Sequence, residues 1–249
     1  MIETGLKDKV VIVTGAAAGI GRATAERFVN EGCRVAAWDV NEAPASAGTF
    51  QKVNVADVDK VEAAVAEVVE RWGRIDVLVN NAGILRDAQL VKFKNGEVQS
   101  RMTDEAWDAV IGVNLKGVFN CTRAVAPQMI AGGGGVILNA SSVAGLNGNF
   151  GQTNYVATKA GVIGMTKTWS RELGRFGIRV NAVAPGFVKT EIIDEMPEKI
   201  IDAMVAHTPM GRIGEVADIA EAYLWLASDK ASWVSGTTIS VDGGLVIGT

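Results

Sequence analysis

Short apolar runs alternate along the chain with longer segments in which apolar residues recur every three or four positions. The run Val10–Val13 is wholly β-branched and apolar, which is typical of a strand buried on both faces. Such runs predict strands at Val10–Val13, Arg34–Trp38, Val53–Val55, Ile75–Val79, Val136–Ala140, Arg179–Val183 and Thr238–Val241. The helical periodicity predicts helices at Ile20–Asn30, Val58–Arg71, Asp104–Met129, Tyr155–Phe176 and Val216–Ala227. Strands alternating with helices predict an α/β fold, a parallel sheet with helices on both faces.

Composition narrows the classes of function. The 249 residues show no repeat or composition break, so we interpret residues 1–249 as one domain. A net charge of −4 without a basic run argues against nucleic acid as a partner. No signal peptide pattern and no apolar stretch of roughly 20 residues is present, so we expect a cytoplasmic protein that does not enter the membrane. One histidine and two separated cysteines supply no metal site.

A glycine-rich turn follows the first predicted strand directly. Thr14–Gly21 contains Gly15, Gly19 and Gly21 and leads into a predicted helix. Such a turn lets backbone N–H groups approach a pyrophosphate. Asp39 ends the second predicted strand, where a carboxylate accepts hydrogen bonds from the adenosine ribose and repels a 2′-phosphate. With no basic residue beside it, the sequence predicts NAD in preference to NADP.

A tyrosine and a lysine lie four residues apart within a predicted helix. At this spacing Tyr155 and Lys159 share a helix face, and we expect the ammonium to lower the pKa of the phenol. Ser142, thirteen residues upstream, offers a hydroxyl for the same substrate oxygen, and Ser141 is an adjacent alternative. These residues predict general acid/base chemistry.

The motifs resemble those of the short-chain dehydrogenase/reductase family over nearly the whole chain. The matching positions are Thr14–Gly21, Asn80–Gly83, Asn114, Ser142, Tyr155, Lys159 and Pro185–Gly186. The resemblance implies a Rossmann fold, doubly wound, with a seven-stranded parallel sheet. It also implies that Tyr155 is the general acid/base, Ser142 orients the carbonyl, Lys159 binds the nicotinamide ribose and Asn114 holds a relay water.

Together with the glycine turn and Asp39, the resemblance gives a set of cofactor-binding residues. They are Gly15, Ala18, Gly19, Ile20, Gly21, Asp39, Asn54, Val55, Asn81, Ala82, Gly83, Tyr155, Lys159, Pro185, Gly186, Val188 and Thr190. Asn54 either contacts the adenine or belongs to the start of the next helix. Residues 187–212 resemble a substrate lid, and the family is typically homotetrameric.

The predicted function is NAD(H)-dependent interconversion of a secondary alcohol and a ketone. The substrate is a small cyclic or aliphatic alcohol or a 3-hydroxyacyl thioester. One alternative is a 3-oxoacyl-(acyl carrier protein) reductase, although basic residues that dock the carrier are replaced here by Gly133 and Phe176. Another is a catalytically silent NAD-binding subunit.

One segment is longer than in typical relatives. Residues 90–102 carry Asn95-Gly96 between alternating residues, which predicts a two-residue β-hairpin. We expect it to lie near the mouth of the active site or across a subunit interface, or to be a solvated loop without a role.

Overall fold

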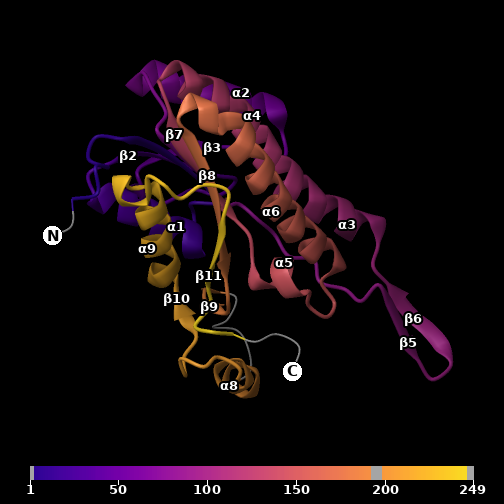
Figure 1. The fold of residues 1–249 in the computed structure, drawn as a ribbon. Coiled ribbons are helices and arrows are strands. Elements are labelled where there is room, and N and C mark those ends of the chain that lie inside the picture. Colours follow the sequence, from indigo (N-terminus) through magenta and orange to yellow (C-terminus); the bar gives the residue numbers. More distant parts are fainter. Residues whose placement is uncertain (1–2, 192–197, 246–249) are drawn as a thin grey trace.

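The computed structural model describes residues 3–191 and 198–245, and its centre is a seven-stranded sheet in the order β11-β8-β7-β4-β1-β2-β3 (Figure 1). All neighbouring strands of this sheet run parallel. Its strands are β1 (Val10–Thr14), β2 (Arg34–Asp39), β3 (Thr49–Lys52), β4 (Val77–Asn80), β7 (Gly135–Ala140), β8 (Ile178–Pro185) and β11 (Thr238–Val241). The predicted doubly wound Rossmann fold is confirmed.

Helices cover both faces of the sheet. The helices of the described residues are α1 (Gly19–Asn30), α2 (Val58–Trp72), α3 (Asp104–Ile111), α4 (Gly117–Ala131), α5 (Val143–Asn147), α6 (Thr153–Leu173), α8 (Glu198–Ala206) and α9 (Val216–Ala227), of which α8 lies beyond the end of the sheet (Figure 1). Single 3-10 turns lie at Ala45–Ala47, Gly174–Phe176 and Asp229–Ala231. A short parallel pair, β9 (Val188–Lys189) and β10 (Gly214–Glu215), lies between β8 and α9. Over the described stretches, no helix has both the length and the apolar character needed to cross a bilayer.

Alternation along β1 shows how the two cores form. Val11 and Val13 pack with α1 and α9 on one face, whereas Val10 and Ile12 pack with α2 and α4 on the other. Both sets are buried, as expected for a parallel strand with helices on each side. The strand order reverses between β1 and β4, and open parallel sheets bind ligands at the carboxyl edge of such a switch point.

The predicted third strand is wrong in position. Residues Thr49–Lys52 pair with β2, and the predicted Val53–Val55 instead follows that strand. Val53 and Val55 are buried against the α2 face as the chain leaves the sheet. The apolar residues Val53 and Val55 therefore mark a buried segment and no strand. The edge strand itself, Thr49–Lys52, is mostly polar and gave no apolar signal.

The predicted helix Asp104–Met129 is broken. A π-helical segment, Gly112–Lys116, separates α3 from α4 and contains Asn114. Such segments widen the helix by one residue and often occur at functional sites. The periodicity of apolar residues continues across the π-helical segment, so the sequence predicted one long helix in place of two consecutive ones.

Residues 90–102 contain an antiparallel hairpin, β5 (Val91–Lys94) with β6 (Glu97–Arg101). Asn95 and Gly96 have φ of 56° and 84°, the left-handed pair that a tight hairpin turn requires. Figure 1 shows this hairpin projecting beyond α3, and every residue of both strands is exposed.

Candidate active site

A cavity of about 1180 Å³ lies along the carboxyl edge of the sheet. Residues at or just past the ends of five strands line it: Gly15, Asp39, Asn81, Ser141 and Gly186. All the predicted cofactor-binding residues line this one cavity, as do the predicted catalytic residues Ser142, Tyr155 and Lys159. The fold thus brings together groups that are up to 175 residues apart, from Gly15 to Thr190.

The amino terminus of α1 faces the cavity without a side-chain cap. Ala18 is the N-cap residue and accepts no hydrogen bond through its side chain, and the first turn has no acidic residue. Its free N–H groups suit an anion such as a pyrophosphate. Gly21 must lack a side chain, because a Cβ there would overlap the carbonyl oxygen of Gly15. These features fit a dinucleotide.

The carboxylate of Asp39 lies beside the glycine-rich turn and is held in place by two backbone hydrogen bonds. Its two oxygens accept hydrogen bonds from the N–H groups of Ala17 at 3.0 Å and Asn41 at 2.9 Å. Each oxygen keeps a further lone pair, so the carboxylate can still accept from a ribose hydroxyl. Asp39 therefore presents a negative charge to the cavity in a defined orientation.

Asn81 holds the ends of β1 and β4 together. Its amide donates to the carbonyl of Thr14 at 3.2 Å, and its backbone N–H donates to the Thr14 hydroxyl at 3.0 Å. Asn54 accepts from the N–H of Ala56 at 3.0 Å, while Asp57 caps α2. Asn54 lines the cavity and also shapes the turn before α2. A contact with the adenine and a place at the start of the helix are therefore compatible.

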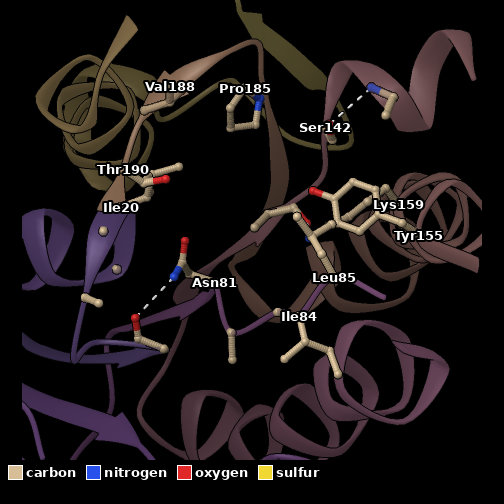
Figure 2. A pocket seen from close by; sticks show the side chains of 18 of the residues that line it. Ile20, Asn81, Ile84, Leu85, Ser142, Tyr155, Lys159, Pro185, Val188 and Thr190 are labelled. Carbon is tan, nitrogen blue, oxygen red and sulfur yellow. Dashed lines mark hydrogen bonds between the residues drawn. The ribbon is translucent and has the colours of Figure 1, made fainter. Parts of the chain in front are cut away.

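Ser142, Tyr155 and Lys159 share one wall of the cavity, and Ile20, Asn81 and Thr190 lie opposite (Figure 2). Ser142 is the N-cap of α5, where its Oγ accepts from the N–H of Ala144 at 3.1 Å. Tyr155 and Lys159 follow one another by one turn on α6. The phenol oxygen in Figure 2 points into the space between the walls.

The predicted effect of Lys159 on Tyr155 is wrong in this structure. Burial is the main influence and raises the pKa of Tyr155, Ser142 lowers it through a hydrogen bond, and the charge of Asp87 raises it further. Lys159 Nζ lies 5.5 Å from the centre of the Tyr155 ring and donates to the carbonyl of Ala140 at 2.7 Å. Desolvation of the phenol dominates, and Lys159 is not among the influences that shift this pKa.

Lys159 is itself strongly perturbed. Its side chain is buried, and desolvation lowers its pKa from 10.5 to about 8. No acidic partner contributes to that shift. A buried cation beside a phenol in a cavity is the kind of arrangement that marks functional sites.

Asn114 lies behind the cavity wall. It is fully buried, its Oδ1 accepts from the N–H of Ile84 at 2.8 Å, and its Nδ2 donates to the carbonyl of Ile84 at 2.9 Å. The side chain of Asn114 thus braces the loop after β4. The π-helical segment sets Asn114 at the depth where it reaches Ile84.

Ser141, the alternative hydroxyl, is engaged elsewhere. It is buried and donates to the carbonyl of Lys159 at 3.0 Å, which ties β7 to α6. The geometry therefore favours Ser142, as the spacing did.

Sequence reasoning missed further residues that line the cavity, among them Asp87, Gln152 and Tyr223. Asp87 and Gln152 are joined by a 2.8 Å hydrogen bond near Tyr155, and Tyr223 reaches the cavity from α9. Asp87 and Gln152 carry no signal in one sequence, because only the fold brings them together. Tyr223 does carry a sequence signal, because a tyrosine hydroxyl within the apolar run of α9 requires a hydrogen-bond partner.

Comparisons with known proteins agree on the family. The family described as Enoyl-(Acyl carrier protein) reductase matches residues 15–246. The 3-oxoacyl-[acyl-carrier-protein] reductase FabG of Thermotoga maritima is 51% identical over 97% of this chain and 99% of its own length. The proteins of the same name from Staphylococcus aureus and Chlamydia trachomatis are 45% and 40% identical, over 95% and 96% of this chain and 98% of their own lengths.

A solved structure leads to the same family. The ligand-free aldohexose dehydrogenase of Thermoplasma acidophilum superposes with a TM-score of 0.90 at 35% identity, covering 99% of this chain and 97% of that one. Proteins of this kind use a nicotinamide cofactor. The chain belongs to the short-chain dehydrogenase/reductase family and is an oxidoreductase acting on alcohol and keto groups.

Proposed function

We propose that the protein is an NAD(H)-dependent reductase that converts 3-oxoacyl thioesters into 3-hydroxyacyl thioesters. The observation that carries this proposal is the pairing of Ser142 with a protonated Tyr155 in a cavity that is also lined by the uncapped amino terminus of α1. The names of the relatives that are 40% to 51% identical favour a thioester over a small cyclic or aliphatic alcohol.

Reduction of a ketone requires a proton for the carbonyl oxygen. Because burial raises the pKa of Tyr155, the phenol stays protonated at neutral pH and serves as general acid. Ser142 hydrogen-bonds the same oxygen and fixes its direction. A bound nicotinamide supplies the hydride.

Lys159 binds the nicotinamide ribose in this proposal. Its ammonium donates to the carbonyl of Ala140 and lies 5.5 Å from the centre of the Tyr155 ring, and its other N–H groups can donate to a ribose hydroxyl. Asn114 holds a relay water in this proposal, as the family resemblance implies, while its side-chain amide makes one hydrogen bond in each direction with Ile84.

Asp39 supports NAD as the preferred cofactor. The basic side chains among the described lining residues are Arg86, Lys159 and His207, and the first two belong to the wall that carries Tyr155. No cation among the lining residues is hydrogen-bonded to Asp39 in the described structure. A 2′-phosphate at that carboxylate would therefore be repelled.

The substrate end is bounded by α8. Ile200, Met204 and His207 line the cavity from this helix and the residue after it, as does Leu85 of the loop after β4. Apolar side chains suit the alkyl part of an acyl group. We propose residues 187–212 as a substrate lid; residues 192–197 of that segment lie outside the described part.

The carrier of the thioester is a separate question. Gly133 and Phe176 offer no charge to an acidic carrier protein, and the guanidinium of Arg175 stacks on the Phe176 ring at 4.6 Å. Electrostatic steering of an acidic partner is weak with one such cation. We therefore propose that coenzyme A thioesters are accepted at least as well as carrier-protein thioesters.

The proposed reaction is tested with purified protein by measuring the loss of NADH absorbance as each substrate is added. Acetoacetyl-CoA should be reduced, whereas crotonoyl-CoA, an enoyl thioester without the ketone, should not be. Reduction of crotonoyl-CoA alone would replace this proposal with the enoyl chemistry named by the matched family. NADH binding without turnover of any ketone would indicate the silent nucleotide-binding subunit.

A second candidate function rests on the aldohexose dehydrogenase likeness. A cyclic secondary alcohol would place its hydroxyl at Ser142 and Tyr155 in the same way. Oxidation of glucose or cyclohexanol with NAD, at an efficiency above that for 3-hydroxybutyryl-CoA, would favour this candidate.

We also propose a homotetramer in which the hairpin contacts another subunit. An isolated two-stranded hairpin is marginally stable in water, and this one exposes Leu90 and Phe93 to 67% and 65%. It carries Lys92, Lys94 and Arg101 against a single acid, on a chain of net charge −4. The negatively charged remainder of a second copy of this chain would attract these basic residues. The cytoplasmic location stays a prediction.

A further inference from the structure

Two hydrogen bonds fasten the loop after β4 to the start of α6. The N–H of Ala88 donates to the carbonyl of Gly151 at 2.9 Å, just before the helix begins. The side chain of Asn154, in the first turn of the helix, donates to the carbonyl of Arg86 at 3.0 Å. Asp87 lies between Arg86 and Ala88, so these bonds place it beside the start of α6.

The side chain of Asp87 is held at this place by a chain of hydrogen bonds. Gln152 donates to a carboxylate oxygen of Asp87 at 2.8 Å and accepts from the side-chain amide of Asn149 at 2.8 Å. All three residues line the cavity, and Gln152 lies three residues before Tyr155. The carboxylate is therefore held close to the part of the cavity wall that Tyr155 forms.

The charge of Asp87 is available to a molecule in the cavity. Asp87 is exposed, and it makes no ion pair with any described residue. The guanidinium of the neighbouring Arg86 donates to the carbonyl of Leu85 at 2.8 Å, and the ammonium of Lys159 donates to that of Ala140. Of the two adjacent charges in the loop, only that of Asp87 is tied to α6 by its side chain.

We infer that Asp87 makes the protein select 3-oxo compounds whose carboxyl group is esterified and reject free 3-oxo acids. This inference rests on the proposed function, in which the ketone oxygen meets Ser142 and Tyr155. In a 3-oxo acid, one methylene group separates the ketone from the carboxylate, so the carboxylate must enter the same part of the cavity and is repelled by Asp87. An ester or thioester at that place carries no charge and is accepted.

The phosphates of coenzyme A do not meet the same repulsion. The pantetheine arm separates them from the thioester by more than the screening distance of about 8 Å at physiological ionic strength. Asp87 therefore acts on the reacting end of the substrate and does not discriminate against this carrier of the acyl group.

The experiment compares acetoacetate with ethyl acetoacetate, which share one ketone and differ in the charge of the carboxyl group. Loss of NADH absorbance gives kcat/KM for each, and the ratio of ester to free acid is the measured quantity. Asp87→Asn removes the charge and keeps an oxygen that can accept from Gln152. Because both substrates use the same phenol, the ratio cancels any effect of the substitution on Tyr155. Asp108→Asn is the control, since Asp108 is exposed on α3 and does not line the cavity.

We expect the parent to favour the ester, and Asp87→Asn to lower the ratio about tenfold at low ionic strength. Asp108→Asn should leave the ratio unchanged. Salt at about 0.5 M should bring the ratio of the parent toward that of Asp87→Asn, because screening weakens the effect of an exposed charge. A ratio that Asp87→Asn leaves unchanged, or that Asp108→Asn changes by the same factor, would overturn the inference.

Failure of the proposed function gives a different result. A parent that does not reduce acetoacetyl-CoA, but prefers ethyl acetoacetate to acetoacetate through Asp87, would lose the thioester substrate and keep the selection by charge. A parent that reduces acetoacetyl-CoA, and uses acetoacetate as efficiently as the ester, would keep the proposed function and overturn this inference.

Discussion

The ammonium of Lys159 donates a hydrogen bond to the carbonyl oxygen of Ala140, the last residue of β7, over 2.7 Å. This bond holds a buried cation at the end of a central strand, and no carboxylate of the described residues forms an ion pair with it. The protein therefore carries an electrostatic cost at the point where the cofactor and the acid/base meet. Binding sites often hold such strain.

Replacing Lys159 by methionine should stabilise the protein without ligand. The pKa of Lys159 is about 8 in the fold against 10.5 ordinarily, so the unfolded chain binds the proton more tightly between those values. The wild-type penalty is thus full below pH 8 and fades toward pH 10.5. We expect Lys159→Met to gain about 1–3 kcal/mol at pH 6.5, less than the full shift because Ala140 loses its partner.

Urea unfolding at pH 6.5 and pH 10 measures this effect. Lys167→Met, on the same helix, is the control and should show no pH-dependent gain. A variant that is less stable than the parent at both pH values would contradict the assignment of Lys159 as a buried, uncompensated charge.

Tyr155→Phe should abolish ketone reduction while NADH binding stays within about twofold. The change deletes only the proton donor, and general acid catalysis of this kind contributes on the order of 10²- to 10⁴-fold. Turnover and fluorescence titration measure the two effects separately. Activity equal to that of the parent on every accepted substrate would exclude Tyr155 as the acid.

Oxidation of the alcohol should accelerate with rising pH. The reverse reaction needs the phenolate, and burial raises the pKa of Tyr155 above its ordinary value of 10.0. The initial rate of NAD reduction should therefore still be rising at about pH 9, whereas ketone reduction should not rise. A plateau of the oxidation rate below pH 7 would show that another group is the base.

The fold was predictable because its signal is local and repeated. Continuous apolar runs such as Val10–Val13 and Val77–Val79 occur in the middle of the sheet, and the alternation of strands with helices leaves few topologies. The edge strand was misplaced because it carries the mixed sequence Thr49–Lys52, and its register depends on β2.

The chemistry was predictable only in part. Ser142, Tyr155 and Lys159 are recognisable by type and spacing, but the direction of the pKa shift at Tyr155 depends on burial and on Asp87. The sequence shows neither how deeply Tyr155 is buried nor that Asp87 lies near it in the fold. The role of Asn114 as a brace likewise depends on the π-helical segment, which periodicity does not reveal.

Asp39→Ser should relax the preference for NADH over NADPH. Removing the carboxylate removes its repulsion of a 2′-phosphate, which is worth about 1–4 kcal/mol or roughly ten- to several-hundredfold in efficiency. The ratio of kcat/KM for the two cofactors measures it, with Asn41→Ser as the control because Asn41 also lines the cavity. Equal efficiencies in the unaltered protein would remove the basis for Asp39 as a selector.

Phe93→Ser should weaken assembly, whereas Lys94→Ser should not. Phe93 pairs across the hairpin with Val98, and Lys94 pairs with Glu97, so the two substitutions act on opposite faces. Because both strands are exposed, neither change should alter the melting of a subunit or its NADH affinity. Light scattering over a dilution series should show the Phe93→Ser protein dissociating at about tenfold higher concentration, the loss expected when one buried aromatic contact is removed. A hairpin without a role predicts the same mass for both variants, and deletion of residues 93–101 with unchanged mass and kinetics would establish that case.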